Sequence, residues 1–326
     1  MSQQANLRER LANEKSEVRA AALAELLQSG ADVSPHIAEV AACLSDPSES
    51  LRFSALLLLG RQGAAAAEYF PAALDPQHPD GVRAAAAAII AGIGPPAVAS
   101  VRGLCRCLTS ADENLRNVAA VALSKIGESA VPSLRIMLQF PNTETIAAAV
   151  DSLALIGRPA EAAVPELQAL AAGSSLPLQL ACAAALCRLT GDPERGLPIL
   201  LNALENAEPP VRKMAAEKIA VLGVAAHAAV PHLLRCSADR HETVRAAAVL
   251  TLGRIQAPYA QLVPGITARL CDPAPEVRYA AVIVLASHGA NARSALTALR
   301  ACLQDPAEKV AMCAAASVEK IESGTP

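Results

Sequence analysis

Apolar residues recur along the chain at three- and four-residue spacing, and short polar turns separate one apolar segment from the next. Val277, Ala280, Ala281 and Val284, for example, fall on one face of a helix. Alanine and leucine dominate these segments, and both residues favour helix over strand. The pattern therefore predicts an all-α fold.

A glycine recurs every 30–34 residues, which divides the chain into repeats. The glycine positions are Gly30, Gly63, Gly94, Gly127, Gly157, Gly191, Gly223 and Gly289, and Gln256 occupies the one gap. Glycine takes the left-handed backbone conformation at a helix C-terminus more easily than other residues. We expect each glycine to end one helix of its repeat, which we call the A helix.

An arginine precedes most of these glycines by 11 residues, within the A helix. The arginines are Arg19, Arg52, Arg83, Arg116, Arg212, Arg245 and Arg278; Ile146 and Leu180 occupy the two other positions. We expect a structural ladder, in which each guanidinium binds a carbonyl or carboxylate of a turn between repeats. A row of arginines could instead bind phosphates, but carboxylates such as Glu49, Glu242 and Glu276 lie between them and would oppose a polyanion.

A polar residue lies six positions before most of these arginine positions, which we call the arginine column. A proline also recurs early in the second half of many repeats. The polar residues are Asn13, Asp46, Gln77, Ser110, Ser174, Asn206, Asp239, Asp272 and Asp305, and the prolines include Pro132, Pro165, Pro198, Pro231 and Pro264. Short polar side chains cap helix N-termini, and the first turn of a helix tolerates proline. We expect the polar residue to cap the A helix, and a second helix, the B helix, to begin near the proline.

The combined pattern of Asp272, Val277-Arg278, Ala280-Ala281, Leu285 and Gly289 resembles the short HEAT repeats named after phycobilisome lyases. The resemblance covers roughly residues 13–324 and implies an α-α superhelix, a HEAT-repeat solenoid of about ten helix-pair repeats. It also implies that A helices line the convex side and B helices the concave, ligand-facing side. We expect one domain over 1–326, with an N-terminal half-repeat cap at 1–13, a C-terminal capping helix at 306–322 and a tail at 323–326.

The charge balance is nearly even, with 28 basic and 31 acidic residues and a formal charge of −3. This balance is not typical of a nucleic-acid-binding protein. No apolar stretch is long enough for a membrane span, and the N-terminus lacks the apolar core of a signal peptide. The nine cysteines are scattered through the helical pattern, as expected of small buried side chains in a reducing compartment. We predict a cytoplasmic protein.

Residue clusters typical of catalysis or metal binding do not stand out. His227 and His232 are five positions apart and would not share one helix face, and His241-Glu242 is a single pair in a turn. Nucleophile motifs and glycine-rich phosphate loops are missing. The sequence therefore predicts no catalytic residue, no cofactor and no metal site.

Basic residues are frequent on the expected exposed side of the B helices. The candidate partner-binding residues are Arg102, Arg106, Arg135, Gln139, Arg235, Arg269 and Arg300. Arginine is enriched in protein interfaces whereas lysine is depleted, so we expect the concave B-helix surface to bind another protein, with an acidic segment as the candidate contact.

The repeat pattern is broken at three positions between residues 140 and 181. Phe140 replaces the polar residue, and Ile146 and Leu180 replace arginine. Sequence divergence of these repeats, compensated by apolar packing, explains the missing polar and arginine residues. The alternative is a bend or a docking surface in the middle of the array.

The sequence predicts a non-catalytic interaction scaffold or adaptor. The alternative is an accessory, chaperone-like factor resembling phycobilin lyase subunits, and a nucleic-acid-binding HEAT protein is a third, less favoured reading because the charge is slightly negative and tryptophan is absent.

Overall fold

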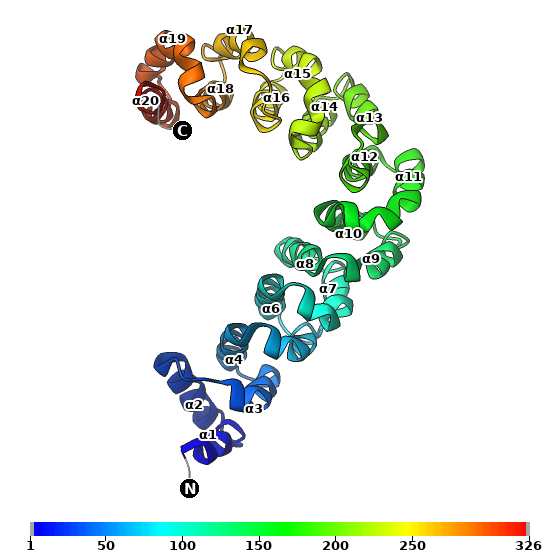
Figure 1. The fold of residues 1–326 in the computed structure, drawn as a ribbon, viewed down its shortest axis with the longest axis vertical. Coiled ribbons are helices and arrows are strands. Elements are labelled where there is room, and N and C mark those ends of the chain that lie inside the picture. Colours follow the sequence, from blue (N-terminus) through cyan, green and yellow to red (C-terminus); the bar gives the residue numbers. More distant parts are fainter. Residues whose placement is uncertain (1–2, 324–326) are drawn as a thin grey trace. The chain divides into compact units, whose positions relative to one another are not determined.

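The computed structural model describes residues 3–323 (Figure 1), and the regular structure in this range consists of α-helices and short 3₁₀ helices without strands. Helices α1 to α20 alternate between two layers, so that A and B helices follow one another along the chain. The structure confirms the predicted all-α solenoid of about ten helix-pair repeats. None of the described helices is long and apolar enough to cross a membrane.

The chain forms two compact units, Met1–Glu166 and Leu167–Pro326, which we call the first and the second unit. The A helices are α2 (Ser16–Ser29), α4 (Glu49–Gln62), α6 (Asp80–Ile93), α8 (Glu113–Ile126), α10 (Thr143–Ile156), α12 (Leu176–Thr190), α14 (Pro209–Ala220), α16 (Glu242–Arg254), α18 (Pro275–Ser287) and α20 (Glu308–Ser323). The B helices are α1 (Gln3–Leu11), α3 (Ile37–Ala42), α5 (Phe70–Ala73), α7 (Val101–Cys107), α9 (Val131–Met137), α11 (Val164–Gly173), α13 (Leu197–Ala203), α15 (Val230–Cys236), α17 (Tyr259–Arg269) and α19 (Leu296–Ala301). The prediction of one domain over 1–326 stays a prediction.

The glycine column ends the A helices as the sequence predicts. All eight glycines of the column have positive φ, from 52° at Gly289 to 82° at Gly127. Gln256, which fills the gap in the column, also has a positive φ, of 53°. The backbone needs this conformation at each A-to-B turn, because the chain must leave one helix and enter a 3₁₀ segment or the next helix in the opposite direction.

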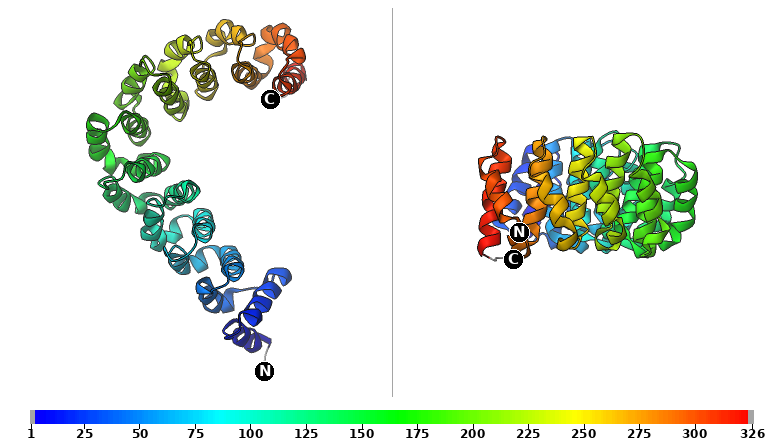
Figure 2. Two further views of the ribbon diagram at one scale, coloured as in Figure 1. Left: turned by 180° about the vertical axis from the view of Figure 1, so that it is seen from behind. Right: turned by 90° about the horizontal axis from the view of Figure 1, so that it is seen from above.

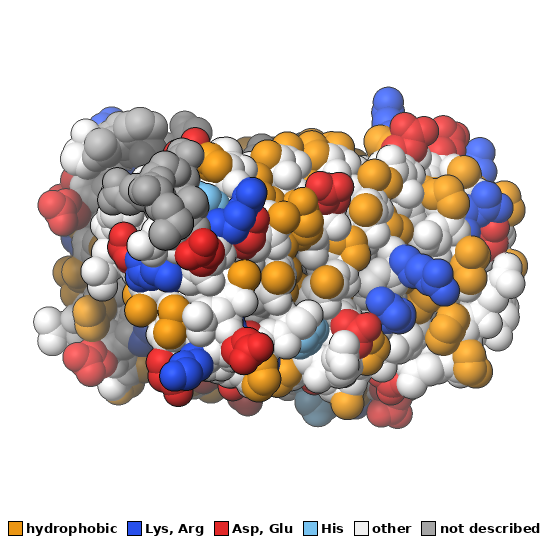
Figure 3. All heavy atoms as spheres, turned by 90° about the horizontal axis from the view of Figure 1, so that it is seen from below, with side chains coloured by type: hydrophobic (Ala, Val, Ile, Leu, Met, Phe, Trp, Pro, Cys, Tyr) orange, Lys and Arg blue, Asp and Glu red, His pale blue; other side chains and the backbone are white. Residues whose placement is uncertain are grey.

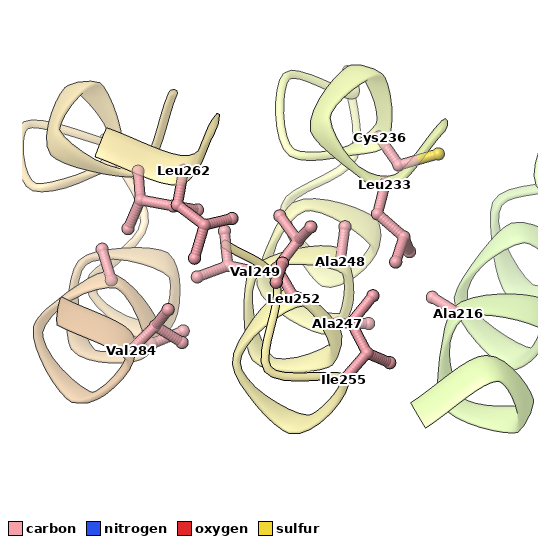
Figure 4. Packing of buried hydrophobic residues seen from close by; sticks show 14 of the residues in the cluster. Ala216, Leu233, Cys236, Ala247, Ala248, Val249, Leu252, Ile255, Leu262 and Val284 are labelled. Carbon is pink, nitrogen blue, oxygen red and sulfur yellow. The ribbon is translucent and has the colours of Figure 1, made fainter. Parts of the chain in front are cut away.

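Small A-helix residues allow successive repeats to pack closely. In the second unit, Leu252 and Ile255 of the α16 repeat are fully buried together with Leu233 and Val284 (Figure 4). A Cβ added at Gly253 would lie 2.8 Å from Val284 Cγ2, so α16 and α18 meet at a glycine. The Thr251 hydroxyl donates to the Ala216 carbonyl of α14 at 3.0 Å, which adds a hydrogen bond between repeats.

The A helices line the inner side of the curve in the second unit, and the B helices lie outside them (Figures 1 and 2). The prediction that the B helices form the concave surface is therefore wrong for this unit. The alanines and glycines of the A helices let α14, α16 and α18 pack directly against one another, whereas the B helices α13, α15 and α17 lie farther apart. The more closely packed layer is the shorter one, so the unit curves toward the A helices.

The terminal helices lie within or near the expected caps. Helix α1 lies within residues 1–13 and packs against α2. Helix α20 extends one residue beyond the predicted 306–322 cap, so Ser323 belongs to the helix rather than to the predicted 323–326 tail. Residues 324–326 of that tail lie outside the described residues.

Candidate functional site

The arginine column connects successive turns between repeats, and Arg245 on α16 shows the full arrangement. Its Nη1 donates to the carbonyls of Asp239 and Arg240, at 2.9 and 3.2 Å. Its Nε and Nη2 donate to the two carboxylate oxygens of Asp272, at 2.8 and 2.7 Å. One guanidinium therefore holds the turn before its own helix and the turn one repeat later.

The same geometry recurs where the repeats are regular. Arg212 binds Asp239, and Arg278 binds Asp305, each with two guanidinium nitrogens at 2.7–2.8 Å. Arg19 binds Asp46 in the first unit. In all four pairs the aspartate lies 27 residues after its arginine. These arginines hold the scaffold together and are not free to bind a partner.

The aspartates of the polar column close the turns rather than cap the A helices, which corrects the sequence prediction. Asp272 Oδ1 accepts a hydrogen bond from the Ala274 N–H at 3.0 Å, two residues later, and Ala274 occupies the N-cap position of α18. Asp239 and Asp305 accept from the N–H groups two residues later in the same way. The A helix begins too late for these side chains to reach its first N–H groups.

The arginine bonds hold these carboxylates in their charged form. Burial raises the pKa of Asp272, but the hydrogen bonds from Arg245 and Ala274 outweigh it, so the net pKa lies below the ordinary value. The pKa of Asp239 is lowered through the same balance with Arg212. For Asp305, the hydrogen bond from Arg278 is the largest cause of the lowered pKa.

The ladder is incomplete in the middle of the first unit. Arg52 is buried and donates to the carbonyls of Asp46 and Pro47, but its Nε has no partner among the described residues. Arg83 pairs with Asp80 on its own helix, and Arg116 binds only the carbonyls of Ser110 and Ala111. The polar column holds Gln77, Ser110 and Phe140 here instead of aspartate, so it offers these three arginines no carboxylate one repeat later.

Other polar residues make the turn hydrogen bonds in the repeats that lack an arginine of the column. Asn142 caps α10 by accepting from the Thr145 N–H at 2.9 Å. Gln179 donates to the Ser174 carbonyl at 2.8 Å, a contact like those that an arginine makes elsewhere. Leu180 is fully buried in α12. Apolar packing and local hydrogen bonds thus replace the missing ladder between residues 140 and 181.

Four of the six candidate arginines on the B-helix side have partners within the chain. Arg135 Nε donates to Glu166 at 2.8 Å, and Arg235 and Arg300 pair with Glu205 and Glu322 at 3.0 and 2.5 Å. Arg269 donates to the Ser237 carbonyl at 3.3 Å and lies 3.6 Å from Asp272. The charges of these four arginines are therefore engaged within the chain.

Arg102 and Arg106 differ from the other candidates. Both are exposed on α7, one helical turn apart, and within residues 3–323 neither guanidinium has a hydrogen-bond or ion-pair partner. Both border a groove of about 370 Å³ between α7 and α9. The groove is lined by Arg102, Cys105, Arg106, Thr109, Ser133, Ile136, Met137 and Phe140, and we call it the α7–α9 groove.

Apolar side chains make up the surface between α7 and α9. Ile136 and Phe140 are 65% and 40% exposed, whereas Cys105 and Met137 are buried beneath them. Burial raises the pKa of the Cys105 thiol to about 12, so this cysteine is a neutral apolar group rather than a nucleophile. The Thr109 hydroxyl donates to the Arg106 carbonyl at 2.8 Å. The groove combines an exposed apolar surface with two free positive charges.

The sequence reasoning named the arginines of this groove but missed its apolar residues. In the sequence, Phe140 only marks a break in the polar column, and Ile136 directly follows the candidate Arg135. Exposed isoleucine on a B helix is the signal that could have shown the groove. Gln139 is exposed in the turn after α9, next to Phe140, and does not line the groove.

Charged residues of both signs are interspersed with apolar ones on the face shown in Figure 3. The described side chains of this face form no continuous basic area of the kind that follows a nucleic-acid backbone. Within the part of the chain that the structure describes, no three histidine, cysteine or acidic residues are grouped to hold a metal ion.

Comparisons with known proteins agree with the repeat architecture. A model of HEAT repeats matches residues 72–154 and 197–263, and a model of the PBS lyase HEAT-like repeat matches residues 277–305. The chain belongs to the HEAT-repeat family. No curated protein matches this HEAT-repeat chain.

Solved HEAT-repeat structures share the fold. The chain is similar to Kap121p bound to Nup53p, with 13% identity, a TM-score of 0.57 and 98% of this chain covered. It is also similar to Kap121p bound to the SUMO protease Ulp1p, with 14% identity, a TM-score of 0.58 and 97% covered. The chain spans 42% of the length of Kap121p in both comparisons. At this level of identity the likeness shows the fold alone.

Proposed function

We propose that the chain is a non-catalytic scaffold or adaptor that binds another protein on its B-helix side, through the α7–α9 groove. The observation that carries this proposal is the exposed apolar surface of Ile136 and Phe140 beside two unpaired arginines. Aromatic residues, methionine and arginine are the side chains that protein interfaces favour. The four other candidate arginines of the B helices, Arg135, Arg235, Arg269 and Arg300, have partners within the chain.

The fold is compatible with this role. Kap121p, which shares the solenoid architecture, has been solved in complex with the proteins Nup53p and Ulp1p. A solenoid stacks its repeats on one another and leaves both outer surfaces of the helix layers open to partners.

Site-specific photo-crosslinking in the native host tests the proposal. A benzoylphenylalanine residue would replace Ile136 in one variant and Thr297, which is exposed on the B helix α19, in a control variant. The proposal predicts a discrete protein adduct at position 136 that is absent at position 297. The captured protein must then bind the purified chain in isolation.

The purified partner allows a quantitative check of the same site. Ile136→Glu is expected to weaken partner binding at least about tenfold, because it places a charge in the apolar part of the interface. Val224→Glu is the matched control, since Val224 is also exposed, at 54%, but lies outside the groove. Equal binding by wild type and Ile136→Glu, with both proteins folded, would rule out this groove as the binding site.

A second candidate function is that of an accessory, chaperone-like factor for chromophore attachment. The match of residues 277–305 with the PBS lyase HEAT-like repeat is the observation that favours it. Co-expression with a phycobilin and its acceptor protein would test it, since the candidate predicts that the chain raises the yield of pigmented acceptor. An unchanged yield would exclude it.

A further inference from the structure

We propose that the segment bound by the α7–α9 groove is acidic, carries two carboxylates about one helical turn apart and places one large apolar side chain between α7 and α9. This inference rests on the protein-binding function proposed above. It adds the chemistry of the partner, which neither the repeat pattern nor the fold determines.

Charge complementarity supports an acidic partner. A guanidinium remains protonated at any physiological pH, so Arg102 and Arg106 carry full positive charges. Arg135 on the neighbouring helix is neutralised by Glu166, and Arg235 on α15 by Glu205. The chain as a whole is slightly acidic, with a formal charge of −3. Arg102 and Arg106 therefore differ from the other arginines of the described B helices, which are paired with carboxylates.

The positions of the two arginines set the spacing of the acidic groups. Arg102 and Arg106 are four residues apart on α7, and such residues lie side by side with Cβ atoms about 5–6 Å apart. Alternate residues of an extended segment are separated by about 6.6 Å. A segment with two acidic residues flanking one central residue matches this separation, as do acidic residues one turn apart on a helix.

The size and lining of the groove indicate the third feature of the partner. A volume of about 370 Å³ lies at the lower end of the range of small-molecule pockets, roughly 300–1,000 Å³. The exposed side chains Ile136 and Phe140 offer an apolar contact beside Met137. The groove thus fits a single leucine- or phenylalanine-sized side chain of a peptide, with the arginines at the border of the contact.

Peptide binding to the full chain, measured by fluorescence anisotropy, tests this inference. The probe is a labelled peptide with one phenylalanine between two glutamates. One comparison peptide replaces both glutamates by glutamine, and a second replaces the phenylalanine by alanine. We expect each change to weaken binding at least about tenfold, because each removes one of the two complementary contacts. Binding of the acidic probe should also weaken as the salt concentration rises.

Charge reversal identifies the arginines as the cause. The double variant R102E/R106E should lose at least about tenfold in affinity for the acidic probe, and should bind a peptide with lysines in place of the glutamates more tightly than wild type does. R235E is the matched control and should bind the acidic probe like wild type, because Arg235 is exposed and lies outside the groove. Its exposed ion pair contributes little to stability.

Three results would overturn the inference. The glutamine peptide could bind as tightly as the acidic probe, the double variant could retain wild-type affinity, or a single-stranded oligonucleotide could displace the probe and bind more tightly. None of these results alters the crosslinking experiment. A protein captured at position 136 that has no acidic segment would refute the acidic partner and leave the scaffold function standing, whereas the absence of any adduct would refute the function itself.

Discussion

At the level of single residues, the surroundings of an arginine decide whether it stabilises the fold or remains available. Arg245 has four hydrogen bonds to two turns and is largely buried, so its charge is fully satisfied. Arg102 has the same charge but no partner among the residues that the structure describes. Residue type alone does not separate these cases, but position in the repeat does, since Arg245 lies 11 residues before the glycine position on an A helix and Arg102 lies on a B helix.

Gly127 provides a test of backbone conformation without side-chain packing. Its φ is 82° and its ψ −140°, a region that residues with a Cβ rarely enter, while a Cβ at this position would meet no atom within 4 Å. Gly127→Ala should therefore lower the free energy of unfolding by about 1–3 kcal/mol through strain alone. Chemical denaturation measures this difference.

Gly81→Ala is the matched control for that variant. Gly81 lies in helix α6 with free space around it, so alanine should be neutral or should stabilise the protein by about 0.5–1 kcal/mol. A similar loss of stability in both variants would contradict the role assigned to the glycine column.

At the level of elements, the turns between repeats are held by bonds that cross from one repeat to the next. The Arg245–Asp272 pair is buried, with side chains 10% and 2% exposed. A pair of this kind fixes the register of two successive turns, since both oxygens of the carboxylate bind one guanidinium. The regular 33-residue spacing of the arginine column over residues 212–278 keeps this geometry through three successive pairs.

Removing the charge of Asp272 should destabilise the second unit. Asp272→Asn is expected to cost about 2 kcal/mol, because the amide cannot accept both bonds from Arg245. Glu276→Gln makes the same chemical change at an exposed residue of the same repeat, which has no ion pair with any residue between 3 and 323, and should cost less than about 0.5 kcal/mol. Denaturation of the two variants side by side gives the comparison, and equal effects would show that the pair adds nothing to stability.

Acid should weaken the same contacts. The pKa values of Asp239, Asp272 and Asp305 are lowered in the folded state, so the unfolded chain binds more protons below the ordinary aspartate pKa of about 4. The stabilisation is complete above that pH and is lost as the pH falls through the folded-state values. Wild type should lose stability between pH 5 and pH 3, as measured by urea denaturation, and Asp272→Asn should lose less than Glu276→Gln does.

Much of the element structure could be predicted from the sequence, and the reasons are local. The glycine column fixes where A helices end, because only a few residues tolerate the left-handed conformation that those turns require. The layer that faces inward could not be predicted from the resemblance, since it depends on how closely alanines and glycines let whole helices approach. The capping prediction was wrong because the A helices α16 and α18 begin three residues after Asp239 and Asp272.

At the level of the whole molecule, the repeats provide a scaffold and the irregularities provide the candidate site. The residues of the α7–α9 groove come from two successive B helices, and Phe140 lies where the polar column lapses. The sequence predicted arginines on the B helices but not which of them lacked partners. That outcome depends on carboxylates such as Glu166, 31 residues from Arg135, which only the packed repeats bring together.

Hydrogen–deuterium exchange of the full chain, with and without the protein captured by crosslinking, tests the central claim most directly. Binding at the groove should slow exchange in α7, in α9 and in the turn around Phe140, where backbone amides lie next to the proposed contact. The A helices of the second unit should exchange at unchanged rates. Protection confined to those A helices, with α7 and α9 unaffected, would contradict the proposal that the chain binds its partner at the α7–α9 groove.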